Sequence, residues 1–314
     1  NLPTKRPRLT MKHPVLRCSY LAFIICDSYG MENLPFYTLK TQKYQVTKDF
    51  YGEKMLKVPI VKLGSTELKV SKLGFGTFDF GAPSLNISPE EGSRILIESY
   101  KLGVNFWDTS DDYGSHPHVA SALKYLPRKE VVISTKTYAK SGEEAQRSLK
   151  SSLKELNTDY VDIFLLHFVK SDHIDGCHQV LKELKEVKAA GIVKAIGLST
   201  HSVAVVRKVA QFDELDVILA VCCKANQALI KKFRKYIPLE NGSMEEMFQA
   251  LKVAHNNGKG VVAMKVLGDQ TPSLVRDYQV AIKAVAQLDF VDAMVIGMRG
   301  LDEVKKNLKV VASS

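Results

Sequence analysis

The sequence has few cysteines, and their spacing fits neither a metal site nor a disulfide framework. Only five occur in 314 residues, and no two are separated by two residues: Cys18, Cys26, Cys177, Cys222 and Cys223. An odd number without a repeated spacing is not expected of a disulfide-stabilised scaffold, an iron–sulfur protein or a zinc knuckle. We therefore predict no metal site.

A long apolar run is missing from the N-terminal region. The apolar run at residues 18–26 (CSYLAFIIC) has nine residues, whereas a membrane-spanning helix needs about 20. A basic stretch precedes it, as in a secretory signal, but no A-x-A cleavage pattern follows. We interpret residues 1–56 as an N-terminal extension, disordered or weakly signal-like, and residues 57–314 as the folded domain. The expected location is the cytoplasm, with export as the alternative.

A concentrated basic stretch is also missing, although the formal net charge is +10 at pH 7. This charge suits an anionic ligand or surface. The lysines are dispersed along predicted helices such as residues 181–188, as on a solvated helix face. We therefore predict no nucleic-acid partner and no stable membrane span. The sequence does not indicate an oligomeric state.

Strand and helix patterns alternate from residue 60 onward. A short hairpin is predicted at residues 60–71, with Gly64 near its turn. Eight short apolar strands then alternate with eight helices, which favours parallel strands joined by helical crossovers. The predicted strands are 73–77, 104–107, 130–136, 160–167, 195–199, 217–221, 260–265 and 293–297, and the predicted helices are 89–102, 119–125, 142–156, 177–190, 203–211, 244–256, 275–287 and 302–311. This order predicts an α/β fold, a (β/α)8 TIM barrel with a short N-terminal β-hairpin.

An open, doubly wound sheet is the alternative arrangement. Sheets of that kind bind dinucleotides through a G-x-G-x-x-G loop after the first strand. Residues 74–81 (GFGTFDFG) lack the third glycine at the required distance. The barrel is therefore the favoured fold.

Polar residues recur at the C-terminal ends of the predicted strands. They are Asp108, Lys136, His167, Ser199, Lys265 and Arg299, with Tyr113 on the loop after Asp108. The strand ends of a parallel barrel meet on one face, where barrel enzymes place their active sites. Any one of these residues could be a satisfied interior polar group, but burying all of them together is costly without a shared function. The pattern predicts an active site at this face.

Several of these stretches resemble motifs of the aldo-keto reductase family. GVNFWDTSDDYG (103–114) resembles the signature that carries an Asp and a Tyr, VVISTK (131–136) the lysine strand, DYVDIFLLH (159–167) the histidine strand, GIVKAIGLS (191–199) the fifth-strand motif, and VIGMRGLDEVKKNL (295–308) the C-terminal cofactor motif. The resemblance covers about residues 58–310, in the family order. It implies reduction of an aldehyde or ketone to an alcohol by NADP(H), with NAD(H) as the alternative cofactor.

The resemblance implies a catalytic tetrad of Asp108, Tyr113, Lys136 and His167. Tyr113 would donate a proton to the carbonyl oxygen while hydride reaches the carbonyl carbon. A free phenol has a pKa near 10, and a neighbouring ammonium favours the phenolate and lowers that pKa. Lys136 would supply the ammonium, Asp108 would hold it, and His167 would orient the carbonyl oxygen or assist proton transfer.

The resemblance also implies contacts to the cofactor. Ser199 would contact the nicotinamide amide, Arg299 a phosphate on the adenosine ribose, and the pair Glu303 and Asn307 the adenine. The full predicted set is Gly76, Thr77, Phe78, Asp108, Ser199, Thr200, Met264, Lys265, Leu267, Arg299, Glu303 and Asn307. The alternative for Arg299 is a structural position at the barrel rim, paired with Asp302.

The sequence departs from the family pattern on the nicotinamide side. Thr200 and then His201 follow Ser199, where many relatives have an Asn. Leu219 stands where a Gln is usual, and Cys222 where an aromatic residue stacks on the nicotinamide. These departures put the binding of the nicotinamide end of the cofactor in doubt, but the four catalytic residues are all present. The basic connection at residues 227–241 is interpreted as a solvated helix, with a lid over the site as the alternative.

Two other functions fit part of the sequence. A Schiff-base aldolase would use Lys136 as its nucleophile, but it has no use for Arg299 or the C-terminal motif. A non-catalytic, nicotinamide-binding redox-sensing subunit would bind cofactor and turn over carbonyls negligibly. The unusual N-terminal extension is the feature that favours this alternative. For the reductase, the predicted partner is a small-molecule carbonyl substrate.

Overall fold

The computed structural model describes residues 58–82, 84–223, 239–267 and 278–314. The predictions made for residues 1–56 and for most of the connection 227–241 fall outside these ranges. Within them, no helix has both the length and the apolar character needed to cross a membrane.

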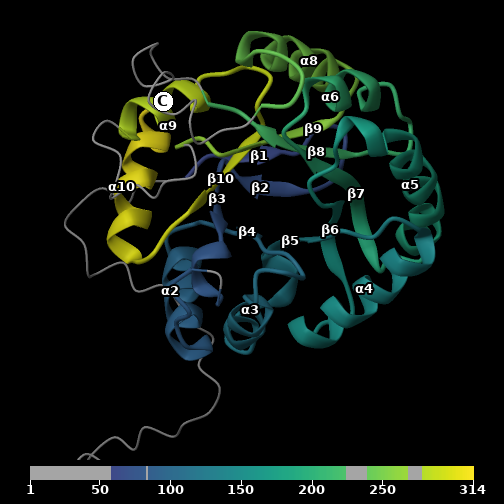
Figure 1. Ribbon diagram of the computed structural model, residues 1–314. Helices are drawn as coiled ribbons and strands as arrows, with labels where there is room; N and C mark the ends of the chain where they lie inside the picture. Colours follow the sequence, from purple (N-terminus) through teal and green to yellow (C-terminus); the bar gives the residue numbers. More distant parts are fainter. Residues whose placement is uncertain (1–57, 83, 224–238, 268–277) are drawn as a thin grey trace, which may run out of the picture. The chain divides into compact units, whose positions relative to one another are not determined.

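Eight parallel strands close into a barrel, and helices surround it (Figure 1). The strands are β3 (Leu73–Gly76), β4 (Phe106–Asp108), β5 (Val132–Thr137), β6 (Val161–Leu166), β7 (Val193–Thr200), β8 (Val217–Val221), β9 (Gly260–Met264) and β10 (Ala293–Gly297). The helices are α2 (Pro89–Lys101), α3 (His116–Leu123), α4 (Gly142–Leu156), α5 (Ile174–Ala189), α6 (Val203–Val209), α8 (Met244–Asn256), α9 (Tyr278–Ala286) and α10 (Leu301–Ala312). Strand β10 pairs back onto β3, and α10 packs beside α2. The predicted (β/α)8 barrel is confirmed.

The predicted N-terminal hairpin is also confirmed, and it packs against the interior of the barrel. Strands β1 (Ile60–Lys62) and β2 (Lys69–Ser71) pair antiparallel. Leu63, Leu68 and Val70 of this hairpin belong to the same buried cluster as the side chains that fill the barrel. Gly64 has a φ of 53°, and a Cβ there would lie 2.3 Å from the backbone N of Gly260. A glycine is therefore required where the hairpin meets the start of β9.

Several predicted boundaries were wrong by two or three residues, and two of the elements concerned lie near the site. The strand predicted at residues 104–107 runs instead from Phe106 to Asp108, so that Asp108 belongs to the strand. The helix predicted at 119–125 begins earlier, at His116, with Pro117 in its first turn and Leu123 as its last residue. Proline is acceptable there because the first turn of a helix has no use for its missing N–H.

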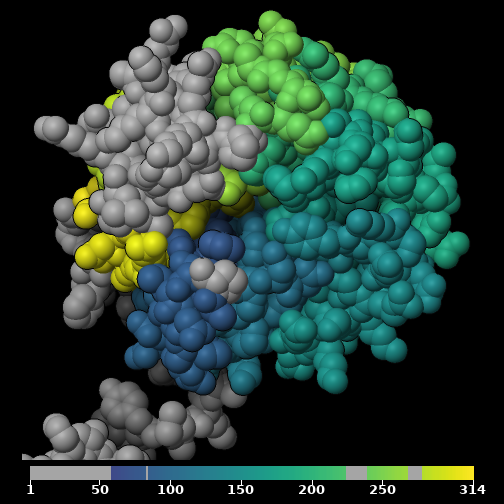
Figure 2. Space-filling view, in the orientation of Figure 1, coloured from purple at the N-terminus to yellow at the C-terminus, as the bar shows by residue number. Residues whose placement is uncertain are grey.

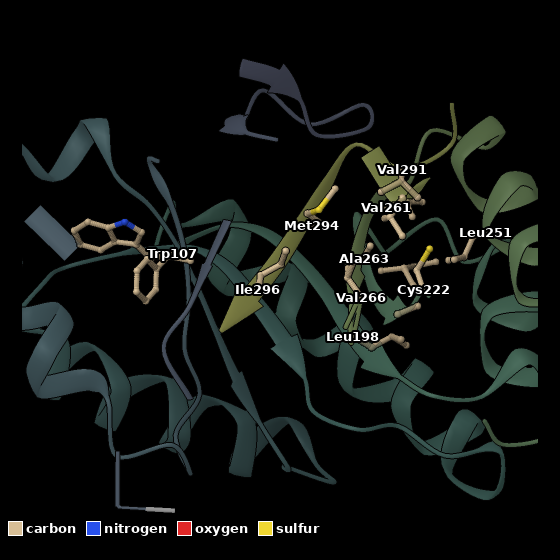
Figure 3. Close-up of a cluster of buried hydrophobic side chains, with 14 of the residues drawn as sticks. Trp107, Leu198, Cys222, Leu251, Val261, Ala263, Val266, Val291, Met294 and Ile296 are labelled. Atoms are coloured by element: carbon tan, nitrogen blue, oxygen red, sulfur yellow. The ribbon is translucent and has the colours of Figure 1, made fainter. Parts of the chain in front are cut away.

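The core has an inner and an outer layer because successive strand residues point to opposite faces. In β4, Phe106 belongs to the cluster inside the barrel, and Trp107 belongs to the cluster between barrel and helices. In β6, Leu165 and Phe164 divide in the same way. Figure 3 shows part of the outer layer, where side chains of β9 and β10, including Val261 and Met294, lie among neighbouring apolar residues. The inner layer fills the barrel below the mouth.

The even-numbered strands share one hydrogen-bonding pattern at their N-terminal ends. Each of β4, β6, β8 and β10 has an Asn or Asp at or just before its start, whose side-chain oxygen accepts a backbone N–H from the preceding odd-numbered strand or the segment entering it. The pairs are Asn105 with the N–H of Ser71, Asp162 with Ile133, Asp216 with Ile196, and Asp292 with Val261, at 2.7–2.9 Å. This fourfold repetition fixes the strands to one another at the end of the barrel away from the active site.

Candidate active site

A cavity of about 700 Å³ lies at the C-terminal ends of the barrel strands. Its lining includes Gly76 of β3, Asp108 of β4, Ser199 of β7, Leu219 of β8 and Gly297 of β10. In Figure 2, the yellow surface of the last strand and helix adjoins the blue surface of the loop and helix that follow β3. The start and the end of the barrel sequence therefore meet at this mouth.

The side chain of Lys136 contacts two other predicted site residues at the wall of the cavity. Its ammonium donates to Asp108 Oδ2 at 2.8 Å and to the backbone oxygen of Thr109 at 2.6 Å. It also contacts Tyr113 Oη at 3.3 Å and lies 4.5 Å from the centre of the Tyr113 ring. Lys136 is only 1% exposed, although it lies near the C-terminal end of β5. Asp108, Tyr113 and Lys136 thus meet as the sequence predicted.

The charges of this group follow from its burial. Burial by itself lowers the pKa of Lys136, but its interactions with the Asp108 carboxylate and with Tyr113 together outweigh this, so that the pKa lies above its ordinary value. Burial raises the pKa of Tyr113, and the Lys136 ammonium opposes that rise. The ammonium therefore acts on Tyr113 in the predicted direction. The expectation of a pKa below that of a free phenol was wrong, because burial outweighs the ammonium.

His167 lies beside Tyr113, with the two ring centres 5.7 Å apart. Its Nδ1 is 3.1 Å from Ser110 Oγ and 3.5 Å from Asp112 Oδ1. Burial, together with repulsion from Lys136, lowers the pKa of His167 to about 3. The imidazole is therefore neutral at physiological pH, and it can orient a carbonyl oxygen without carrying a charge.

A chain of buried hydroxyl groups supports the backbone around Asp108. Ser115 Oγ lies 2.8 Å from both Thr77 Oγ1 and Thr109 Oγ1. Thr77 in turn donates to the backbone oxygen of Asp108 at 2.9 Å. Because the Thr109 carbonyl also accepts from Lys136, this chain fixes the segment that carries the buried ion pair.

Eight of the twelve predicted cofactor residues line the cavity: Gly76, Phe78, Asp108, Ser199, Met264, Lys265, Leu267 and Arg299. The other four, Thr77, Thr200, Glu303 and Asn307, are not in its lining. The Thr200 hydroxyl donates to the backbone oxygen of Val169 at 2.7 Å, and Asn307 is fully buried in α10. Among the residues that depart from the family pattern, His201 and Leu219 line the cavity, whereas Cys222 is fully buried.

Two of the predicted site residues have buried side-chain atoms without a hydrogen-bond partner in the described part of the chain. They are Asp108 Oδ1, at the cavity wall, and both polar atoms of the Asn307 amide. Unpaired buried polar atoms are costly, and they mark places where a ligand can supply the missing partner. A cofactor rich in hydroxyl groups and ring nitrogens has the donors and acceptors that these atoms need. The residues present therefore fit a dinucleotide cofactor.

Asp79 is a cavity residue that the sequence reasoning missed. It lies on the 3-10 turn η2 (Phe78–Phe80) after β3, and its Oδ1 accepts from Ser84 Oγ at 2.7 Å. Its Oδ1 is also 3.8 Å from an Arg299 guanidinium nitrogen. The ion pair that the structure shows for Arg299 therefore involves Asp79, and not Asp302 as in the alternative considered for this residue. An acidic residue in the first loop, directly after Gly76-Thr77-Phe78, was the available signal.

Three aromatic side chains surround the catalytic groups, and two of them were not predicted. Phe78 packs edge-on against Tyr113 with ring centres 5.1 Å apart, Tyr138 lies over His167 at 4.5 Å, and Phe168 follows His167 directly. Phe168 has a φ of 52°, and Lys265, across the cavity, has a φ of 56°. Side chains of this size rarely adopt the left-handed region, and such strain concentrates at functional sites.

Known proteins share both the sequence and the fold of this chain. L-galactose dehydrogenase of Arabidopsis thaliana is 26% identical over 82% of this chain and 89% of its own length. The NADH-specific methylglyoxal reductase of Escherichia coli is 26% identical over 76% of this chain and 79% of its own length. Among solved structures, the holo form of an aldo-keto reductase from Bacillus halodurans superposes with a TM-score of 0.63 at 21% identity, covering 81% of this chain and 91% of the other; at that identity it supports the fold alone.

The sequence also matches the model of the Aldo/keto reductase family over residues 72–277. That range runs from the entry to β3 past the end of β9, and it includes Asp108, Tyr113, Lys136 and His167. Members of this family are oxidoreductases that bind nicotinamide cofactors and act on small carbonyl compounds. The chain belongs to the aldo/keto reductase family.

Proposed function

We propose that this protein reduces an aldehyde or ketone to an alcohol with NADP(H), using Tyr113 as the general acid. The observation that carries the proposal is the Lys136 ammonium, which contacts Asp108 Oδ2 and Tyr113 Oη together at the wall of an open cavity. A bound reduced nicotinamide supplies the hydride that adds to the carbonyl carbon. The side chains of the site stabilise and then neutralise the negative charge that develops on the carbonyl oxygen.

Tyr113 donates its proton to that oxygen, and Lys136 stabilises the phenolate that remains. Asp108 keeps Lys136 charged and in place. The pKa of Tyr113 is raised, so the hydroxyl is fully protonated before reaction and serves as a donor. His167 is neutral and orients the oxygen toward Tyr113. This division of roles puts each charge where the transition state needs it.

The Schiff-base alternative fits the same contacts less well. A nucleophilic lysine needs a neutral amine, and enzymes obtain one by lowering the pKa of the lysine. Here the Asp108 carboxylate raises the pKa of Lys136, which keeps the amine protonated. The contacts of Lys136 therefore favour the reductase.

We propose NADP(H) over NAD(H) because Arg299 lines the cavity just past the end of β10. A planar guanidinium suits a phosphate group better than other cations do. Lys265, at the end of the neighbouring strand β9, adds a second cation to the lining. The related methylglyoxal reductase of Escherichia coli is named as NADH-specific, so the preference must come from residues of this chain.

The proposal is tested with Tyr113→Phe. We expect kcat for aldehyde reduction to fall by about 10²–10⁴-fold, the usual contribution of general acid catalysis. Cofactor affinity, measured by quenching of protein fluorescence, should stay within about twofold because the hydroxyl acts only as the hydride transfers. Retention of near wild-type kcat would remove Tyr113 from the mechanism. Absence of turnover in the wild type together with tight cofactor binding would favour the redox-sensing alternative.

A further inference from the structure

The carboxylate of Asp79 is held beside the guanidinium of Arg299 at the mouth of the cavity. Its Oδ1 is 3.8 Å from Arg299 Nη2, and its side chain is only 11% exposed. Ser84 Oγ donates to the same Oδ1 at 2.7 Å. These two contacts hold the carboxylate in one orientation, and all three residues line the cavity.

Asp79 also lies against the backbone at the end of β10. A Cβ on Gly297 would come within 3.0 Å of Asp79 Oδ2, so the missing side chain at Gly297 leaves the space that the carboxylate approaches. Gly297 lies two residues before Arg299 in the turn that leads into α10. The carboxylate therefore reaches the same turn from which Arg299 extends, and a ligand bound there meets an anion and a cation together.

A second carboxylate near Arg299, that of Glu303, binds the backbone and does not face the cavity. Glu303 Oε2 accepts the backbone N–H of Arg299 at 2.9 Å, which caps the turn before α10, and Glu303 is not in the cavity lining. Asp79 is thus the acidic group, among the described residues of this corner, that faces both the guanidinium and the cavity.

We propose that Asp79 is a specificity-determining residue that opposes Arg299 in the choice of cofactor. The inference rests on the proposed function, in which Arg299 binds the 2′-phosphate of NADPH. That phosphate carries up to two negative charges, and it must share the guanidinium with the fixed carboxylate. NADH has only an uncharged hydroxyl group at the same position, which the Asp79 carboxylate does not repel. Asp79 therefore lowers the affinity for NADPH and leaves that for NADH unaffected.

The test compares Asp79→Asn with wild type in equilibrium titrations of NADPH and NADH. The amide keeps the size of the side chain and its acceptor oxygen for Ser84, but it removes the charge. We expect the Kd for NADPH to fall about tenfold, equivalent to about 1.4 kcal/mol, and the Kd for NADH to change less than twofold. Raising the salt concentration should shrink the difference between variant and wild type, because screening weakens partly exposed charges.

Asp289→Asn is the matched control. Asp289 is 78% exposed on the connection between α9 and β10, so this variant removes the same charge at the end of the barrel away from the cavity. It should leave both affinities unchanged. Thermal unfolding of both variants checks that the fold is intact.

Arg299→Ala separates a failure of this inference from a failure of the proposed function. If Arg299→Ala weakens NADPH selectively while Asp79→Asn changes nothing, Asp79 has no role in selection and the NADP(H) assignment stands. Equal tightening of both cofactors by Asp79→Asn would also overturn the inference, since Asp79 would then act on a part that they share. If Arg299→Ala weakens both cofactors equally, the NADP(H) assignment fails and the inference fails with it.

Discussion

Gly81 controls the position of the proposed proton donor, which can be tested by adding one methyl group. A Cβ built at Gly81 would lie 1.6 Å from the backbone oxygen of Tyr113 and 2.8 Å from its carbonyl carbon. Gly81 has φ −83° and ψ 177°, an extended conformation that alanine adopts without strain. The requirement for glycine is therefore one of space, since the loop carrying Tyr113 packs directly on Gly81.

The size of the effect follows from this overlap. Ordinary contact begins near 3.4 Å, so in Gly81→Ala the two backbones must separate by about 1.8 Å. A misplacement of about 1 Å in a reacting group can cost about 10²-fold in rate. We therefore expect kcat to fall by about 10²-fold or more. The loss should not exceed that of Tyr113→Phe, because Gly81 acts on the reaction only through Tyr113.

The assay is steady-state reduction of an aldehyde by Gly81→Ala, by Tyr113→Phe and by the double variant, with cofactor titrations of each. Overpacking lowers stability by about 1–3 kcal/mol, so thermal unfolding is measured as well. A merely structural effect would lower kcat in the Tyr113→Phe background too. Our reasoning requires that Gly81→Ala costs almost nothing further there.

Gly176→Ala is the matched control for the glycine substitution. Gly176 lies in α5, and nothing approaches within 4 Å of a Cβ built on it. Alanine at such a helical position stabilises by about 0.5–1 kcal/mol, and kcat should not change. Near wild-type kcat in Gly81→Ala, or additive losses in the double variant, would refute the argument.

Two further predictions concern the buried ion pairs at the two ends of the barrel. Lys136→Met should raise the pKa of Tyr113 further because it removes the ammonium that opposes the rise, so kcat should fall and the alkaline limb of its pH profile should move to higher pH. Asp108→Asn should lower kcat less than Lys136→Met does. A larger loss of kcat from Asp108→Asn would indicate that Asp108 contacts the cofactor or the substrate directly. At the other end, Asp162 Oδ2 accepts from the Ile133 N–H and from Arg128, and Oδ1 pairs with Lys194. Asp162→Ala should lower the free energy of unfolding by about 1–3 kcal/mol because it leaves the buried N–H of Ile133 without an acceptor, as measured by urea denaturation, with kcat for the folded fraction unchanged. A loss well below about 1 kcal/mol would show that this N–H finds another partner.

The sequence predicted the barrel well because its signal is repeated. Strand and helix alternate eight times, and one misplaced boundary does not alter the topology. Asp108, Lys136 and His167 could be predicted for the same reason, since each stands at the end of a strand whose direction the fold dictates. Tyr113 followed from the family signature, and the structure places it against Lys136.

The residues that were missed lie on loops or depend on side-chain orientation. Asp79 turns into the cavity because η2 bends the chain after β3, and no periodic pattern encodes that turn. Phe168 reaches the cavity through a left-handed backbone conformation, which cannot be predicted from the sequence at a position that is not glycine. Thr200 stands where many relatives have an Asn and was included with the cofactor residues, but adjacent strand residues point to opposite faces, and its hydroxyl donates to the backbone oxygen of Val169.

Polar side chains at the N-terminal end of the barrel are hydrogen-bonded and stabilise the fold, whereas those at the C-terminal end are available for activity. At the N-terminal end, the Asn and Asp side chains each accept a backbone N–H from the neighbouring segment, which fixes the strands. At the C-terminal end, Asp108 Oδ1 has no hydrogen-bond partner among the described residues, and Phe168 and Lys265 have left-handed backbone conformations. Departures of this kind persist only where the surrounding structure enforces them. The satisfied end therefore supplies the rigidity that lets the other end hold the Asp108 carboxylate, paired with Lys136 through one oxygen, with its second oxygen ready for a ligand.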